Sequence, residues 1–267
     1  AGVIEAVGDG LAGFAVGDRV IGLPGFGGFS SHMVLPGAKM VKMPYAMSFD
    51  DGATFIFTYG TSHYALKNRA KLQPGETLLI LGAAGGVGAA AIELGKAMGA
   101  RVIAAVSSQE KADFCRDLGA DDTIIYARDM DRDAQKAFSG EIKSVAGPAG
   151  VHVVYDAVGG NYAEPAVRAL AWEGRFLVVG FPAGIPKLPL NLTLLKSCQI
   201  MGVFWGAFTQ MDPKTHAAYL AELMDWYAAG KIKPRISARY DFADAPDAIR
   251  LLEDRKVLGK VVVTMGD

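Results

Sequence analysis

The feature that most constrains the fold is an apolar run of strand length that leads directly into a glycine-rich loop. Residues 78–81 read LLIL, residues 82–88 read GAAGGVG, and from Val87 apolar residues recur at helical spacing up to Met98. In such a strand, loop and helix the glycines allow a tight turn and a close approach to a pyrophosphate, which the helix N-terminus binds. The motif therefore predicts dinucleotide binding. The alternative is that the glycines only permit close packing of the helix on the strand.

The pattern after residue 76 is a regular alternation of strand-length apolar runs with helical segments. The expected strands are 77–81, 101–106, 123–126, 151–156, 175–179 and 199–203, and the expected helices are 87–98, 110–118, 131–138, 162–169 and 191–196. This alternation is typical of stacked βαβ units. We therefore expect an α/β fold, with six parallel strands in a doubly wound sheet of the Rossmann type.

The segments before and after this alternating region (77–203) have a different sequence pattern. Short strands separated by Gly and Pro precede it, as at 17–29, and indicate a partial β domain. Helices near 213–229 and 246–252 and a strand at 260–264 follow it. The chain starts inside a strand-like segment at 3–7 without an initiator Met, so we expect an N-terminal piece to be missing. With 267 residues, two domains are expected.

Charge, hydropathy and cysteine content exclude several classes of protein. The net charge of −1, with 21% charged residues, gives no basic excess for a nucleic-acid partner. No apolar stretch reaches the roughly 20 residues that span a bilayer, and no signal peptide opens the chain. Cys115 and Cys198 are isolated, so they form neither a disulfide framework nor a four-cysteine metal site. We expect a cytoplasmic protein without membrane or nucleic-acid partners.

The end of the second strand of the block indicates which dinucleotide binds. Sites that prefer NAD usually carry an acidic residue there, about 20 residues after the glycine loop, to bind ribose hydroxyls. This chain has Ser107, Ser108 and Lys111 instead, and two hydroxyls with an ammonium group suit a 2′-phosphate. We therefore expect NADPH as cofactor. The alternative is that one of the serines caps the next helix and Lys111 is a solvated charge, and capping is compatible with phosphate contact.

With these features the chain resembles the quinone oxidoreductase branch of the medium-chain dehydrogenase/reductase superfamily over essentially its whole length. The resemblance is carried by GDRV at 17–20, YGTSHYAL at 59–66, the glycine loop, VYDAVGG at 154–160, GRFLVVG at 174–180 and GVFWG at 202–206. It implies a GroES-like catalytic domain at 1–61 and 206–267, wrapped on an NADPH-binding Rossmann domain at 62–205, with the active site in the cleft. Relative to the family pattern the first part of the catalytic domain is absent, so we expect an N-terminally truncated chain.

The resemblance also implies which residues hold the cofactor. The residues expected at the adenosine and pyrophosphate end are Gly85, Gly86, Val87 and Gly88 for the pyrophosphate, and Ser107, Ser108, Lys111 and Tyr126 for the 2′-phosphate. The residues expected at the other end are Val158 and Gly159 for the nicotinamide ribose, and Gly180, Phe181, Phe204 and Trp205 for the nicotinamide. Ordinary packing is the alternative for Tyr126 and Trp205.

Zinc-dependent members of the superfamily use cysteine ligands, which this chain lacks at the corresponding places. The loop at 22–29 is short and cysteine-free, and no cysteine stands near 57–59. A tetrahedral zinc site cannot be completed without those ligands, and the isolated histidines are expected to be packed or surface residues. We therefore expect zinc-independent hydride transfer from NADPH to a quinone or an α,β-unsaturated carbonyl compound. Tyr59 and Thr61 carry the nearest hydroxyls to stabilise the developing oxyanion.

Other functions and the assembly state remain open at this point. The chain could be a non-catalytic NADPH-binding protein or an inactive truncated form of an enzyme, and its neutral charge counts against the RNA binding of some relatives. The last strand of the block, 199–203, carries no charge and is expected at a sheet edge, where antiparallel pairing with a second copy would form a homodimer. The alternative is that the helix at 213–229 of the same chain covers this edge strand.

Overall fold

The computed structural model describes residues 1–254 and 256–266, which form two compact units. The larger unit is Thr58–Ile232, and the smaller one combines Ala1–Phe57 with Lys233–Asp267. The compact units thus divide the chain after residues 57 and 232, whereas the functional domains expected from the sequence divide it after residues 61 and 205. The functional division stays a prediction.

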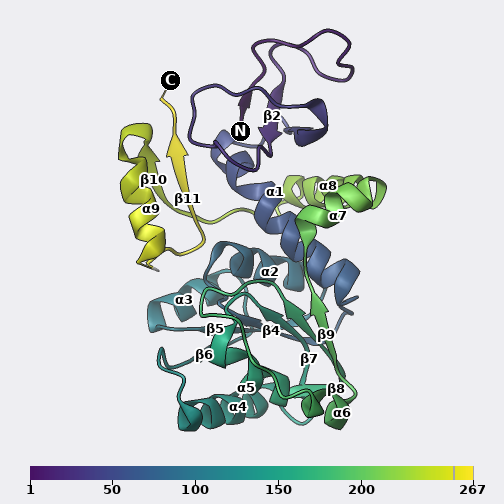
Figure 1. The fold of residues 1–267 in the computed structure, drawn as a ribbon, viewed down its shortest axis with the longest axis vertical. Helices are drawn as coiled ribbons and strands as arrows, with labels where there is room; N and C mark the ends of the chain where they lie inside the picture. The colour runs from purple at the N-terminus through teal and green to yellow at the C-terminus, as the bar shows by residue number, and fades with distance from the viewer. Residues whose placement is uncertain (255, 267) are drawn as a thin grey trace. The chain divides into compact units, whose positions relative to one another are not determined.

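The larger unit is built on a six-stranded parallel sheet (Figure 1). Its strands are β4 (Thr77–Leu81), β5 (Arg101–Val106), β6 (Asp122–Ile125), β7 (Val151–Asp156), β8 (Leu170–Val178) and β9 (Gln199–Gly202). The strand order is β6-β5-β4-β7-β8-β9, and every adjacent pair is parallel. The expected doubly wound α/β sheet is therefore confirmed. The central strand β4 is buried at all five positions, as its LLIL run predicts.

Helices cover both faces of this sheet (Figure 1). They are α2 (Gly86–Ala97), α3 (Gln109–Asp117), α4 (Arg132–Ala146), α5 (Ala163–Arg168) and α6 (Asn191–Lys196). The chain moves outward from β4 in one direction and from β7 in the other, so right-handed crossovers place α2 and α3 on one face and α4, α5 and α6 on the opposite face. Helix α4 is longer than the expected 131–138 because its buried side continues through Ile142 and Ala146.

Further helical segments lie at the start and at the end of the larger unit. Helix α1 (Phe49–His63) continues without a break into a π-helix (Tyr64–Arg69), and the chain after β9 forms α7 (Trp205–Met211) and α8 (Pro213–Ala228). The sequence analysis missed α1 and α7 and predicted α8 closely. Residues 58–63 of α1 belong to the larger unit.

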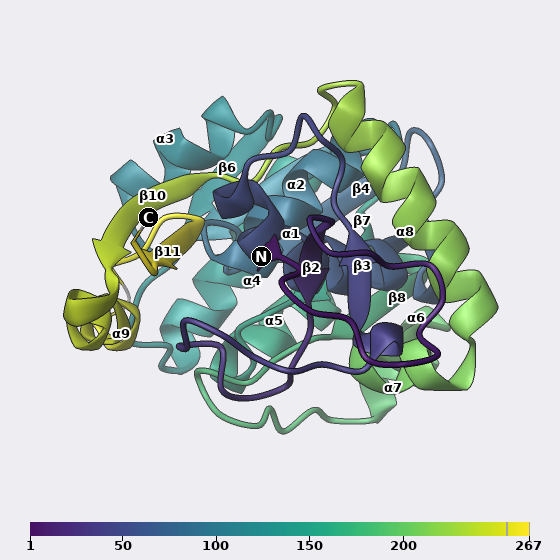
Figure 2. The same ribbon diagram turned by 90° about the horizontal axis from the view of Figure 1, so that it is seen from above.

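The smaller unit is rich in short strands. Strands β1 (Gly2–Val3), β2 (Arg19–Gly22) and β3 (Met40–Lys42) form an antiparallel sheet, while β10 (Ile236–Asp241) and β11 (Lys260–Thr264) form a parallel pair. Figure 2 shows β10 and β11 side by side, with α9 (Ala245–Glu253) packed against them. Arg19 fastens β2 to the segment before α1, because its guanidinium donates to the Met47 carbonyl at 2.7 Å. Short 3₁₀ turns occur at Gly37–Lys39, Gly160–Tyr162 and Phe242–Asp244.

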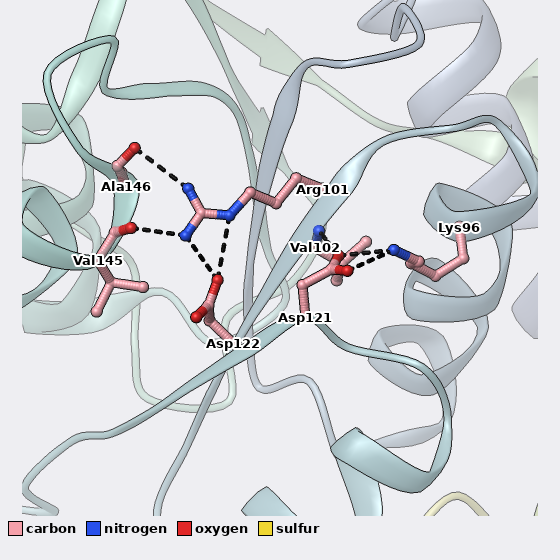
Figure 3. Close-up of polar contacts among 7 residues, drawn as sticks. All are labelled: Lys96, Arg101, Val102, Asp121, Asp122, Val145 and Ala146. Carbon is pink, nitrogen blue, oxygen red and sulfur yellow. Dashed lines mark hydrogen bonds and ion pairs between the residues drawn. The ribbon is translucent and has the colours of Figure 1, made fainter.

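A polar network ties the amino ends of β5 and β6 to the neighbouring helices (Figure 3). The Asp121 carboxylate accepts hydrogen bonds from Lys96 Nζ and from the Val102 N–H, each at 2.7 Å. Arg101 bonds the Asp122 carboxylate at 2.6 Å, and it also donates to the last carbonyls of α4. The network therefore fixes one end of the sheet and leaves the loops at the carboxyl ends of the strands to form a site. Among the described residues, no helix is both long and apolar enough to cross a membrane.

Candidate functional site

Three loops meet where the strand order of the sheet reverses direction. They follow β4 (residues 82–85), β7 (157–160) and β8 (179–184), and β4 and β7 are adjacent, with Leu81 paired to Asp156. Ligands of doubly wound sheets bind at this position, outside the carboxyl ends of the strands. The sheet thus brings together the glycine loop and the segments around Val158 and Gly180 that the sequence analysis assigned to one cofactor.

The glycine loop has no room for side chains at the places where the main chain turns. Gly82 has a φ of +73°, and a Cβ atom on Gly88 would lie 2.4 Å from the Gly82 carbonyl oxygen. Gly85 precedes α2 without a side-chain cap, so the first N–H groups of the helix beginning at Gly86 have no side-chain acceptor at that position. We call the glycine loop and the first turn of α2 the pyrophosphate cradle. It fits a pyrophosphate, which needs a close approach of the main chain and N–H donors from a helix. The predicted residues Gly85, Gly86, Val87 and Gly88 all lie in it.

The loop after β7 is held by the carboxylate of Asp156. Its Oδ1 accepts hydrogen bonds from the N–H groups of Val158 at 2.9 Å and Gly159 at 2.8 Å. Gly159 adopts a φ of +73°, and a Cβ atom there would lie 2.6 Å from the Gly184 carbonyl oxygen. The turn therefore requires glycine at this position and sets Val158 and Gly159 against the loop after β8.

The loop after β8 carries Gly180 and Phe181. The Gly180 N–H donates to the Asp156 main-chain carbonyl at 3.2 Å. Phe181 is 47% exposed. On the other side of Val158, a Cβ atom on Gly82 would lie 2.8 Å from a Val158 methyl group. Val158 thus contacts the glycine loop, while Gly180 and Phe181 lie in a loop that is packed against Gly159.

The residues predicted to choose the cofactor lie together at the end of β5. Ser108 is the N-cap of α3 and accepts a hydrogen bond from the Lys111 N–H at 3.4 Å, so the capping alternative holds for Ser108. The Lys111 ammonium lies 3.4 Å from Ser107 Oγ. The three side chains are half-buried. Their two hydroxyls and one ammonium group remain a suitable set for a 2′-phosphate.

Tyr126 stands just beyond β6, where its ring packs against other aromatic residues. The ring centroids of Tyr126 and Tyr162 are 4.8 Å apart, and those of Tyr126 and Phe138 are 5.7 Å apart. Tyr162 also donates from its hydroxyl to the Arg128 carbonyl at 2.9 Å, which fixes the segment after Tyr126. The packing role left open for Tyr126 is therefore present, and its contact with a 2′-phosphate stays a prediction.

Phe204 and Trp205 have very different surroundings. Phe204 is 76% exposed, whereas Trp205 is buried. A Cβ atom on Gly60 would lie 2.8 Å from the Trp205 ring, and the ring centroids of Trp205 and His216 are 5.6 Å apart. Trp205 therefore packs between α1 and α8, as its structural alternative predicted, and a nicotinamide contact by either residue stays a prediction.

The two hydroxyls proposed for catalysis both lie on α1. Tyr59 is buried and its hydroxyl donates to the carboxylate of Glu93 on α2. Thr61, two residues further along the helix, is half-buried. The Tyr59 hydroxyl is thus engaged in fastening α1 to α2, and a catalytic role would require it to leave Glu93.

The sequence analysis missed a buried polar chain beside the glycine loop. Ser62 Oγ donates to the Val87 carbonyl at 2.8 Å and lies 2.9 Å from the Tyr155 hydroxyl. Burial raises the pKa of Tyr155, although the Ser62 hydrogen bond opposes this shift, so the phenol stays neutral. These hydrogen bonds link α1 and β7 to the first turn of α2. Two hydroxyls at unconnected places in the sequence gave no signal for it.

Metal-binding and nucleophilic groups are not gathered in the parts of the chain that the structure describes. No group of three or more His, Cys, Asp or Glu side chains within residues 1–254 and 256–266 is arranged to hold a metal ion. Burial raises the pKa of Cys115 to about 12, and burial also raises the pKa of Cys198. The two thiols are therefore unreactive packing residues.

Comparison with known proteins gives consistent results. The family model described as zinc-binding dehydrogenase matches residues 86–224. The quinone oxidoreductase-like protein 2 homolog of Nematostella vectensis is 35% identical over 266 residues, which are 98% of this chain and 71% of the relative.

Solved structures resemble the chain over nearly its whole length. Escherichia coli quinone oxidoreductase, determined as a complex with NADPH, has a TM-score of 0.88 and 28% identity, with 98% of this chain and 80% of that chain covered. The CurK enoyl reductase has a TM-score of 0.84 and 30% identity, with 99% and 77% covered. The chain belongs to the zinc-binding dehydrogenase family, in the quinone oxidoreductase branch of the medium-chain dehydrogenase/reductase superfamily.

Proposed function

We propose that this chain is an NADPH-dependent oxidoreductase that reduces a quinone or an α,β-unsaturated carbonyl compound without zinc. The observation that carries the proposal is the meeting of the glycine loop with the loops of Val158 and Gly180 at the switch point of the sheet. Quinone oxidoreductase-like relatives and the NADPH complex of a structural neighbour support it.

The residues present fit the two ends of NADPH. Gly85 to Gly88 would hold the pyrophosphate through main-chain N–H groups, and Ser107, Ser108 and Lys111 would hold the 2′-phosphate. The loops of Val158 and Gly180 would hold the nicotinamide nucleotide. When bound, NADPH supplies a hydride, and the protein orients the cofactor and the acceptor.

Reduction of a carbonyl-conjugated acceptor develops negative charge on oxygen, which hydrogen-bond donors must stabilise. We assign this task to Tyr59 and Thr61, the two hydroxyl residues of this part of α1, and a donation by Tyr59 would require its hydroxyl to leave Glu93. In the structure, Tyr59 and Glu93 keep α1 in place on α2. The hydrogen bond from Ser62 Oγ to the Val87 carbonyl also holds α1 against the first turn of α2, beside the pyrophosphate cradle.

The substrate class has two members because the relatives divide in the same way. One similar structure is a quinone oxidoreductase and another is an enoyl reductase. We place quinones first and α,β-unsaturated carbonyl compounds second. We propose zinc independence because the cysteine ligands are missing. A cytoplasmic homodimer paired through β9 completes the proposal.

The test is NADPH consumption followed at 340 nm with 1,4-benzoquinone or an enoyl thioester as acceptor. Turnover with either acceptor, unchanged after dialysis against a chelator, supports the proposal. Activity that disappears on chelation and returns with zinc overturns zinc independence. NADPH binding without turnover of either acceptor favours the alternative, a non-catalytic NADPH-binding protein.

A further inference from the structure

We propose that Asp156 is a positioning residue that holds the nicotinamide end of the cofactor site in shape. It joins two loops, residues 157–160 and 179–184, which we call the nicotinamide shelf. The inference rests on the proposed function, because that function places Val158, Gly159, Gly180 and Phe181 against the nicotinamide nucleotide.

The side chain and the main chain of Asp156 hold different loops. Its Oδ1 accepts the N–H groups of Val158 and Gly159, at 2.9 and 2.8 Å. Its main-chain carbonyl accepts the N–H groups of Val179 and Gly180, at 2.9 and 3.2 Å. One residue at the end of β7 therefore fixes the starts of both loops.

The two loops are also bonded directly to each other. The Ala183 N–H donates to the Val158 carbonyl at 2.9 Å, and the Gly160 N–H donates to the Gly184 carbonyl at 2.6 Å. Loss of the Asp156 side chain would release the N–H groups of Val158 and Gly159 and so disturb the shelf on both sides. Val158 contacts Gly82, but the cradle keeps its own support from the Gly85 N–H, which donates to the Gly82 carbonyl at 3.1 Å.

Keeping a carboxylate at this position is costly for the fold. The side chain is 2% exposed, and burial raises the pKa of Asp156 even though the two N–H groups oppose that shift. A buried acid destabilises unless its hydrogen bonds compensate. The compensation here is directed at the two N–H groups that shape the loop. An asparagine could accept the same hydrogen bonds through its amide oxygen without the buried charge.

The adenosine end of the site does not depend on Asp156. Ser107 and Lys111 follow β5, and Ser108 holds the first turn of α3 by its own cap. A ligand that carries the adenosine 2′-phosphate but lacks the nicotinamide nucleotide should therefore be insensitive to the shelf. Adenosine 2′,5′-bisphosphate is such a probe.

The experiment measures the dissociation constants of NADPH and adenosine 2′,5′-bisphosphate by calorimetry. In Asp156→Ala the NADPH constant should rise about 10-fold or more, since two hydrogen bonds to a charged acceptor are lost. The constant for the bisphosphate should stay within about 3-fold, a change of under 1 kcal/mol. Asp156→Asn should restore NADPH binding to within about 3-fold of the parent, because the amide oxygen replaces Oδ1. A purely structural role would weaken both ligands together.

The matched control is Asp121→Ala at the opposite end of the sheet (Figure 3), which removes the acceptor of Lys96 and Val102. It should lower stability while leaving the ratio of the two dissociation constants unchanged. If Asp156→Ala does not fold, Asp156→Ser gives the same comparison, because its short hydroxyl cannot span both N–H groups. An unchanged ratio in the Asp156 variants overturns the positioning role. A parent protein that binds neither ligand overturns the proposed function, and the inference with it.

Discussion

The ammonium group of Lys111 lies 3.4 Å from Ser107 Oγ, directly beyond the carboxyl end of β5. The two side chains reach this position from different elements, since Ser107 follows the strand and Lys111 lies in the first turn of α3. Capping by Ser108 fixes that turn. A cation is thereby held where a dinucleotide site binds the adenosine ribose.

We expect Lys111→Ala to narrow the preference for NADPH over NADH. Loss of a charge-assisted hydrogen bond costs about 1.5–3 kcal/mol, which corresponds to a roughly 10-fold to 150-fold weaker NADPH complex. NADH lacks the 2′-phosphate, so its affinity should change little. Titration of both cofactors by tryptophan fluorescence measures the two constants. Lys136→Ala, which removes an exposed lysine of α4, is the control and should leave both unchanged. Equal affinities for the two cofactors in the parent would contradict the assignment.

The sequence predicted best the elements that are buried on both faces of the sheet. The bounds expected for β4, β5 and β7 are those found, because central parallel strands are continuous apolar runs that end at turn residues. The glycine loop was predicted equally well, because its main chain has no space for a Cβ atom at Gly82 or Gly88 and so requires glycine there.

The elements that the sequence did not reveal have mixed or weak patterns. Helix α1 buries polar residues such as Thr58 and Ser62 beside its apolar ones, so its buried side does not read as an apolar stripe. Strand β10 alternates half-buried and exposed residues over only six positions. The role of Asp156 depends on which main-chain N–H groups the folded loops present, and no residue pattern records that.

Below neutral pH, stability should depend on His63, which is fully buried at the end of α1. Its Nε2 lies 3.0 Å from the Glu222 carboxylate on α8, and its Nδ1 has no hydrogen-bond partner among the described residues. Burial lowers the pKa of His63 to about 4, although the Glu222 charge opposes this shift. Between that value and the ordinary 6.5, the unfolded chain binds a proton that the folded chain does not. The free energy of unfolding should therefore fall as the pH falls through this window, by at most about 1.4 kcal/mol per pH unit.

His63→Gln should flatten this dependence, because a glutamine amide can still donate to Glu222 but does not titrate. Urea unfolding at pH values from 4.5 to 7 (roughly the window above) measures the effect. His32→Gln, which changes an exposed histidine of the smaller unit, should keep the slope of the parent. An identical slope in His63→Gln and the parent would show that other groups cause the acid sensitivity.

A bidentate ion pair should make a second contribution to stability. Arg175 bonds both carboxylate oxygens of Glu76, at 2.8 and 2.6 Å, and the pair fastens the segment before β4 to β8. Burial raises the pKa of Glu76, but the Arg175 and Gln73 hydrogen bonds outweigh it and hold this pKa below its usual value. Glu76→Gln should lower the free energy of unfolding by about 1.5–3 kcal/mol at neutral pH. The difference from the parent should shrink as the pH falls from the usual glutamate pKa toward the lower pKa of the folded state, because the unfolded parent then binds a proton at Glu76 that the folded parent does not.

Chemical denaturation of Glu76→Gln at pH 7 and pH 4 measures both effects. Glu141→Gln, on the exposed side of α4, is the control and should stay within about 0.5 kcal/mol of the parent. A Glu76 variant as stable as the parent at pH 7 would mean that the pair only offsets its own desolvation.

The edge strand β9 leaves apolar residues uncovered within one chain. Ile200 is 37% exposed and Phe204 is 76% exposed. Helix α8 therefore does not cover this edge, which was the alternative to pairing with a second copy. The preceding segment adds further exposed apolar residues, at Ile185, Leu190, Leu194 and Leu195. Exposed apolar surface of this extent marks an interaction site. The Gly202 carbonyl is already bonded by Arg69 Nε at 3.1 Å, so pairing with a second copy should centre on Ile200.

We therefore expect a homodimer in which two β9 strands pair antiparallel about a two-fold axis and join the two sheets. Ile200→Lys places a charge in the centre of this pairing and should convert the dimer to a monomer, since a lysine protects an edge strand from association. Ile125→Lys charges β6, the opposite edge of the same sheet, and should leave the dimer intact. Light scattering at micromolar concentration distinguishes the two variants. NADPH affinity of Ile200→Lys should change little, because Ile200 lies outside the glycine loop and outside the loops of Val158 and Gly180. A parent protein that is already monomeric, or a dimer disrupted by Ile125→Lys alone, would show that β9 is not the interface.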